Sequence, residues 1–207
     1  MLSSIKLLSS IAIMLSSIFL SYCFFTKKGI FAPNPIVVRN LEIKIGGNFS
    51  LINQDGQIIH SNNFKDKYMI IFFGFSSCKK ICPMNLGIIS ELLSKLDEKT
   101  NNKLQAFFIT VDPERDNVKK LKEFHQQFDH RIQMLTGEKE KISQVIADYK
   151  VYSSKIVEED EINHSSIIYL IGPKGKYITH FIADLNSDES QSDKIKNEIK
   201  KYINEKS

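Results

Sequence analysis

The sequence predicts an α/β domain that follows an apolar N-terminal segment. Two uninterrupted apolar runs, at residues 68–73 and 104–111, are typical of parallel strands buried on both faces. Between them, apolar residues repeat with helical spacing from about residue 83 to residue 99, so the three segments predict a strand–helix–strand unit. With 207 residues and 42% hydrophobic content, the chain is long enough to form one domain with a full core.

The N-terminal segment is a nearly uncharged run from Leu7 to Phe25, with lysines on both sides of it. Roughly 19 residues at about 1.5 Å per residue give a helix as long as a bilayer is thick. We therefore expect residues 1–26 to be an uncleaved membrane anchor. A cleaved signal peptide and lipidation at Cys23 are the alternatives, but no Ala-x-Ala-like site follows, and Tyr22 is bulky where a lipoprotein signal has a small residue.

Residues 27–45 contain Pro33 and Pro35 and predict a tether, and the folded domain is expected to comprise residues 46–207. A β-hairpin is expected first, with strands at residues 48–52 and 57–60 joined by the turn-forming Asn53-Gln54-Asp55-Gly56.

Further elements follow the second buried strand. Residues 112–116, Asp-Pro-Glu-Arg-Asp, form a loop that is most simply a turn and helix start with a local ion pair. Helical spacing continues over residues 118–128 and 142–149, a second hairpin joins residues 166–171 to 176–181, and a helix at about 190–203 ends the domain. This order predicts a thioredoxin-like fold with an extra N-terminal hairpin and an inserted helix.

Cys78 and Cys82 lie where the first buried strand gives way to a helix. Pro83 suits the first turn of that helix, which places Cys82 at or beside the N-cap. Free N–H groups and the helix dipole stabilise a thiolate there, so both sulfurs are expected to be more acidic than an ordinary cysteine. A single pair is too small for a disulfide scaffold, which favours a functional pair that exchanges disulfides or binds a soft metal.

His164 precedes the strand expected near Ser166, and in a thioredoxin-like topology the loop entering that strand lies against the cysteines. Two thiolates and one imidazole suit Cu(I), which accepts three soft ligands, whereas zinc normally takes a fourth. A structural disulfide and a thiol oxidoreductase without metal remain open. The other histidines have no Cys partner in any motif and are expected to serve on the surface or in packing; these are His60, His125, His130 and His180.

The motifs that carry a family resemblance extend over the whole folded region. They are residues 46–51 (Gly-Gly-Asn-Phe-Ser-Leu), Phe73-Gly74-Phe75, Cys78-x-x-x-Cys82-Pro83, residues 108–116, Leu135-Thr136-Gly137, His164-Ser165 and residues 169–175. With these motifs the chain resembles the Sco/SenC family of copper-binding, membrane-anchored assembly factors for cytochrome c oxidase.

The resemblance implies that Cys78, Cys82 and His164 bind a copper ion, with Cys78 and Cys82 also a redox pair. It implies a metallochaperone rather than an enzyme, with the copper-bearing subunit of the oxidase as its partner and other copper carriers as further candidates. The alternative is a thiol-disulfide reductase, or a peroxidase of related fold.

Two departures concern the surroundings of these residues. The family usually has Pro-Asp after the first cysteine and Asp before the histidine, where this chain has Lys79-Lys80 and Asn163. The lysines are expected to favour thiolates, or else to act in partner docking. Residues 112–116, at the same edge of the sheet, are candidates to support the site from outside the ligand set.

The charge of the chain gives no sign of nucleic-acid binding. The net charge is only +4, and the 28 basic and 24 acidic residues are interleaved along the chain, which excludes a nucleic-acid-binding stripe. We expect the domain to lie outside the cytoplasm, in a bacterial periplasm or a mitochondrial intermembrane space.

Overall fold

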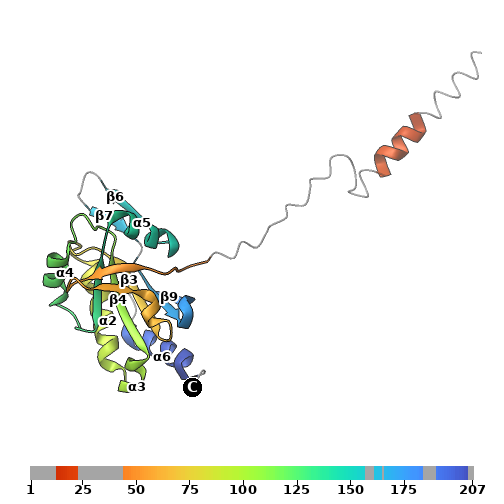
Figure 1. Ribbon diagram of the computed structural model, residues 1–207. Coiled ribbons are helices and arrows are strands. Elements are labelled where there is room, and N and C mark those ends of the chain that lie inside the picture. The colour runs from red at the N-terminus through yellow and green to blue at the C-terminus, as the bar shows by residue number, and fades with distance from the viewer. Residues whose placement is uncertain (1–12, 23–43, 157–160, 165, 184–189, 205–207) are drawn as a thin grey trace, which may run out of the picture. The chain divides into compact units, whose positions relative to one another are not determined.

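The computed structural model describes residues 13–22, 44–156, 161–164, 166–183 and 190–204 (Figure 1), with the backbone alone at 153–156, 161–164 and 204. The chain divides into two units, residues 1–42 and 43–207. In the first unit, residues 13–22 form a helix that exposes large apolar side chains such as Ile13, Phe19 and Leu20. No helix within the described ranges is long and apolar enough to cross a membrane. Most of the predicted anchor and tether lies outside the described residues.

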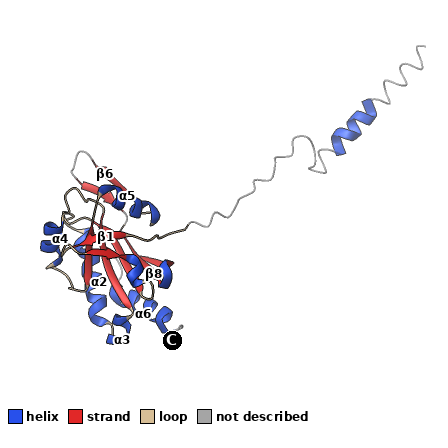
Figure 2. Ribbon diagram, viewed as in Figure 1, coloured by secondary structure: helices blue, strands red, loops and turns tan. Residues whose placement is uncertain are grey.

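The second unit is built on a seven-stranded sheet in the order β2-β1-β5-β4-β3-β8-β9 (Figure 2). Strands β3, β4 and β5 are parallel, and β1 and β8 pair antiparallel to the outer sides of this group. The strands are β1 Ser50–Asn53, β2 Ile58–His60, β3 Tyr68–Gly74, β4 Leu104–Thr110, β5 Ile132–Thr136, β8 Ile167–Gly172 and β9 Lys176–Ile182. A separate two-stranded sheet pairs β6 (Ser153–Ile156) with β7 (Glu161–His164).

Helices cover both faces of the larger sheet. The helical segments are η1 Ser61–Phe64, α2 Ile81–Lys95, α3 Glu98–Asn102, α4 Val118–His125, α5 Lys139–Asp148, η2 Pro173–Gly175 and α6 Gln191–Asn204. Apolar residues of α2, α4 and α6 share one core with one face of the sheet, and α5 packs on the other face.

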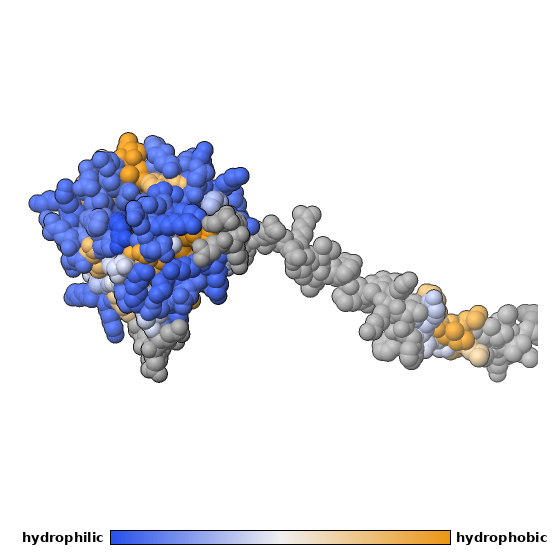
Figure 3. Space-filling model, turned by 90° about the horizontal axis from the view of Figure 1, so that it is seen from below, coloured by the Kyte–Doolittle hydropathy of each residue, from blue (hydrophilic) through white to orange (hydrophobic). Residues whose placement is uncertain are grey.

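Strand β3 shows why its sequence has no polar alternation. Ile70 and Phe72 belong to the core beneath α2, while Ile71 and Phe73 belong to the core on the α5 side. All four side chains are fully buried because both faces of the strand are covered. On the surface, the face of this unit that Figure 3 shows is mainly hydrophilic.

The predicted order of elements is confirmed, with additions. The first hairpin, the parallel strand–helix–strand unit, α4, α5, the second hairpin and α6 lie where the pattern indicated. The predicted helix from residue 83 to residue 99 instead starts at Ile81 and stops at Lys95, and α3 follows as a separate helix. Strand β5 and the β6–β7 sheet were not predicted.

Candidate metal and redox site

The two cysteines lie at the carboxyl end of β3. Cys78 is in the loop between β3 and α2 and is half-buried, whereas Cys82 is the second residue of α2 and is fully buried. Neither forms a disulfide within the described part of the chain. The N–H of Cys82 donates to Sγ of Cys78 over 3.4 Å, and the N–H of Cys78 donates to the carbonyl oxygen of Phe75 over 3.2 Å. The first turn of α2 therefore directs a backbone donor at the sulfur of Cys78.

Gly74, the last residue of β3, provides the space for the sulfur of Cys82. A Cβ atom at position 74 would lie 2.7 Å from Sγ of Cys82 and 2.9 Å from Cε2 of Phe108, both closer than real Cβ contacts. Sequence reasoning quoted this glycine within a motif but gave it no role. The available signal was a glycine that ends a buried strand just before the cysteine loop.

The expectation that both thiols are more acidic than usual is wrong for Cys82. Its pKa is raised, first by a hydrogen bond with the side chain of Cys78 and then by burial, and the nearby carboxylate of Asp116 adds to the shift. The hydrogen bond with Cys78 and burial both disfavour the charged form of Cys82, against the stabilisation expected at the helix N-terminus. The proton therefore stays on Cys82, and Cys78, which accepts the backbone hydrogen bond, is the sulfur better placed to carry negative charge.

Asp116 connects the loop of residues 112–116 to the cysteine loop. Its carboxylate is 1% exposed and accepts hydrogen bonds from the backbone N–H of Ser76 (2.9 Å), from the hydroxyl of Ser76 and from Oγ1 of Thr110 (2.7 Å). It thereby joins the end of β4 to the segment that carries Cys78. The predicted local ion pair is also present, between Arg115 and Asp112.

Arg115 adds a second contact between the same two loops. Its guanidinium lies over the ring of Phe75, 5.9 Å from the centroid. The loop of residues 112–116 thus contacts the segment next to Cys78 at two points, as a supporting role requires.

His164 is the last residue of β7, and β8 begins three residues later. Because β8 runs antiparallel to β3, with Ile168 opposite Phe72, the chain enters β8 at the sheet edge where the cysteine loop leaves β3. The topological part of the prediction therefore holds. The side chain of His164 lies outside the described residues, and among the side chains that are described no three His, Cys, Asp or Glu residues form a metal-binding group.

The remaining predicted residues lie as follows. Lys79 and Lys80 are exposed beside the cysteines, and Asn163 is in β7 with its side chain outside the described residues. His60, His130 and His180 are exposed, and His125, at the end of α4, is partly buried. These positions agree with surface and packing roles.

Comparison with known proteins gives consistent matches over the folded unit. A family model described as SCO1/SenC matches residues 38–204. The SCO2-like protein of Rickettsia conorii is 38% identical over 152 residues, which cover 71% of this chain and 74% of that protein.

Solved structures match the same region. The copper-bound ScoI of Bradyrhizobium japonicum has a TM-score of 0.68 and 34% identity, covering 76% of this chain and 99% of that one. A second match, at TM-score 0.62 and 28% identity over 75% of this chain and 91% of that one, is BsSco, a cytochrome c oxidase assembly protein of the Sco family with a disulfide switch.

Proposed function

The chain belongs to the SCO1/SenC family, and from this membership and the geometry at Cys78 and Cys82 we propose that it is a membrane-tethered copper metallochaperone. It would carry copper to the binuclear copper centre of cytochrome c oxidase. The observation that carries the proposal is the pair of reduced cysteines at the start of α2, which lie so close that Sγ of Cys78 accepts a hydrogen bond from the N–H of Cys82.

The donor set fits copper. Cys78 and Cys82 supply two soft sulfurs, and His164 supplies the imidazole expected as the third ligand. Two thiolates and a Cu(I) ion leave one negative charge, which the exposed Lys79 and Lys80 partly offset.

The buried thiol determines how loading depends on pH. Metal ligands must be deprotonated, so copper uptake has to displace the proton of Cys82, whose pKa is raised. Copper binding therefore releases a proton and weakens as the pH falls.

Residues 1–26 are proposed to be the membrane anchor, with the folded unit outside the cytoplasm. The helix at residues 13–22 supports this, since all of its described large apolar side chains are more than half exposed, from Ile13 at 69% to Ile18 at 55%. Such a surface is unfavourable in water and favourable in lipid.

The test measures copper bound by the full chain, purified in mild detergent under reducing conditions. We expect one copper ion per chain, and loss of most of it in each of Cys78→Ser, Cys82→Ser and His164→Ala. His130→Ala, an exposed histidine on a different loop, is the matched control and should retain copper. Full retention of copper by Cys78→Ser would contradict the ligand assignment.

A thiol-disulfide oxidoreductase is the second candidate function, favoured by the asymmetry of the pair. In that reaction a partner's disulfide is reduced to two thiols while Cys78 and Cys82 are oxidised to a disulfide. Reduction of a partner by His164→Ala at the wild-type rate would favour the enzyme. Copper binding needs both sulfurs as thiolates, so we expect the disulfide form of Cys78 and Cys82 to exclude Cu(I).

A further inference from the structure

Three segments of the folded unit meet at the edge of the sheet where β3 begins. The backbone N–H of Lys174, in the turn between β8 and β9, donates to the carbonyl oxygen of Lys65 over 2.7 Å. The chain enters the folded unit beside the same turn, because a Cβ atom at Gly46 would lie 3.6 Å from the carbonyl oxygen of Gly175. We name this surface the lysine edge and define it as residues 44–47, 65–67 and 174–176.

The lysine edge holds the excess positive charge of the chain. It contains five lysines and one carboxylate, that of the exposed Asp66, so its net charge equals the +4 of the whole chain. The rest of the chain therefore has equal numbers of basic and acidic residues. None of the five ammonium groups forms an ion pair with a described residue. The five are Lys44, Lys65, Lys174 and Lys176, which are exposed, and Lys67, which is partly buried.

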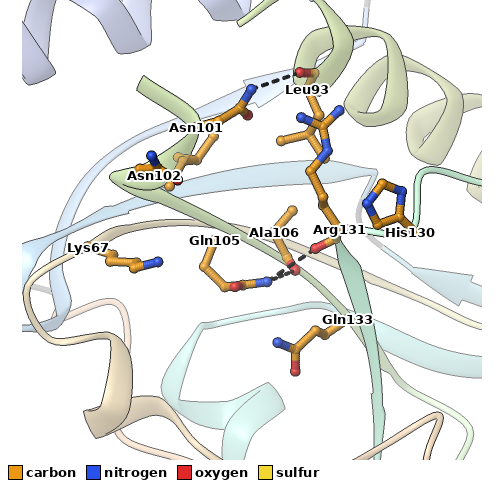
Figure 4. Close-up of a pocket in the computed structure, with 10 residues that line it drawn as sticks. Lys67, Leu93, Asn101, Asn102, Gln105, Ala106, His130, Arg131 and Gln133 are labelled. Atoms are coloured by element: carbon orange, nitrogen blue, oxygen red, sulfur yellow. Dashed lines mark hydrogen bonds between the residues drawn. The ribbon is translucent and has the colours of Figure 1, made fainter. Parts of the chain in front are cut away.

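The excess charge ends at the pocket between the starts of β3, β4 and β5. Figure 4 shows Lys67 on one side of this pocket and Arg131 on the other. Arg131 donates from Nε and Nη2 to the carboxylate of Asp129, at 2.8 and 2.6 Å, which compensates its charge. The uncompensated lysines thus lie on the side of the sheet formed by β3, β8 and β9.

Lys174 has a backbone conformation that suits other residues better. Its φ of 60° and ψ of 23° are left-handed, and Gly175 after it also has a positive φ. Glycine and asparagine adopt this conformation at lower cost than lysine does. The turn itself therefore does not account for an exposed lysine at position 174.

We propose that the lysine edge docks on an anionic phospholipid surface. This assignment rests on the proposed membrane anchor, because the apolar segment leads into the folded unit at Lys44, within the lysine edge. Each lysine near anionic headgroups adds to the attraction, and five lysines act together. Strand β3 spans seven residues, or about 23 Å. Docking at its start therefore holds Cys78, beyond its end, clear of the headgroups and open to a partner in the aqueous phase.

The test uses the full chain, reconstituted into vesicles of phosphatidylcholine alone or of phosphatidylcholine and phosphatidylglycerol in equal amounts. Sulfosuccinimidyl acetate, which does not cross membranes, acetylates exposed amines, and mass spectrometry gives the rate at each lysine. In the anionic vesicles we expect Lys65, Lys174 and Lys176 to react about tenfold more slowly, relative to Lys79 and Lys80 beside the cysteines. Salt at about 1 M, where the Debye length is about 3 Å, should abolish this protection.

Charge reversal locates the contact. The double variant Lys174→Glu, Lys176→Glu should remove the protection of Lys65, which is their neighbour. The double variant Lys119→Glu, Lys120→Glu reverses two exposed charges in α4 and is the matched control, so Lys65 should stay protected. All four substituted lysines are exposed, and both variants should therefore fold as the wild type does.

The outcomes distinguish this proposal from the membrane anchor. Equal relative acetylation of the lysine edge in both kinds of vesicle would overturn it and leave an acidic protein as the candidate partner. Equal loss of protection in the two double variants would overturn it as well. Flotation with phosphatidylcholine vesicles tests the anchor alone. If the chain floats only with anionic vesicles, and Lys174→Glu, Lys176→Glu prevents this, the anchor fails and the docking surface stands. Flotation with neither would contradict both.

Discussion

Replacement of Gly74 by alanine tests how closely the sheet is fitted to the buried cysteine. The added Cβ would lie 2.7 Å from Sγ of Cys82, so the sulfur must move by about 0.7 Å to reach an ordinary contact, and the ring of Phe108 at 2.9 Å must move as well. Overpacking of this kind costs about 1–3 kcal/mol. Alanine in place of a strand glycine returns about 0.5–1 kcal/mol. The clash is the larger effect, and we expect a net loss of about 1–2 kcal/mol in the free energy of unfolding.

The assay is urea unfolding of the full chain, together with the rate at which Cys78 and Cys82 react with a disulfide reagent. Gly87→Ala is the matched control, because nothing lies within 4 Å of its added Cβ in the middle of α2. That substitution should stabilise by about 0.5–1 kcal/mol through helix propensity. Gly74→Ala should also change the reactivity of the pair, since the sulfur of Cys82 is displaced. Equal stability and equal thiol reactivity of wild type and Gly74→Ala would refute the reasoning.

Two further predictions concern carboxylates. Asp116→Ala leaves the donors of Ser76 without a buried charged acceptor and should lower the free energy of unfolding in urea by about 3–5 kcal/mol. Glu114→Ala removes an exposed carboxylate nearby and should cost less than about 0.5 kcal/mol. Equal effects of the two substitutions would contradict the role of Asp116 in joining β4 to the cysteine loop. The pKa of Asp193 is lowered by Lys196 and then by Lys95, so its contribution is present above the usual carboxyl pKa and is lost as pH falls below about 4. Wild type should therefore lose stability more steeply than Asp193→Asn in acid titrations followed by circular dichroism, and parallel curves would contradict this.

Much of the fold follows from local pattern. The apolar run at residues 68–73 and the repeat in α2 each identify an element, because a strand covered on both faces and an amphipathic helix have distinct periodicities. Strand β5 was missed, since its five residues are too few for a periodicity and include Gln133. Its place between β1 and β4 is set by pairing with strands distant in sequence.

The position of the cysteine pair could be predicted from the sequence, but its electrostatics could not. Cys78 and Cys82 could be selected from spacing and from the helix start that Pro83 indicates. Which sulfur is buried could not be predicted, because that depends on the space left by Gly74 in a neighbouring strand. The hydrogen bond with the side chain of Cys78, and then burial, raise the pKa of Cys82, which is the reverse of the expected direction. Likewise, the contact of Asp116 with Ser76 joins residues 40 positions apart.

The unequal exposure of the two cysteines imposes an order on any encounter with another protein. An incoming sulfur reaches Cys78 first, because that side chain is half-buried while Cys82 is covered completely. A covalent adduct with a partner is therefore expected through Cys78, and Cys82 then resolves it from inside the protein. In Cys82→Ser that second step is missing, so the adduct should persist and allow the physiological partner to be isolated while still attached to the chain.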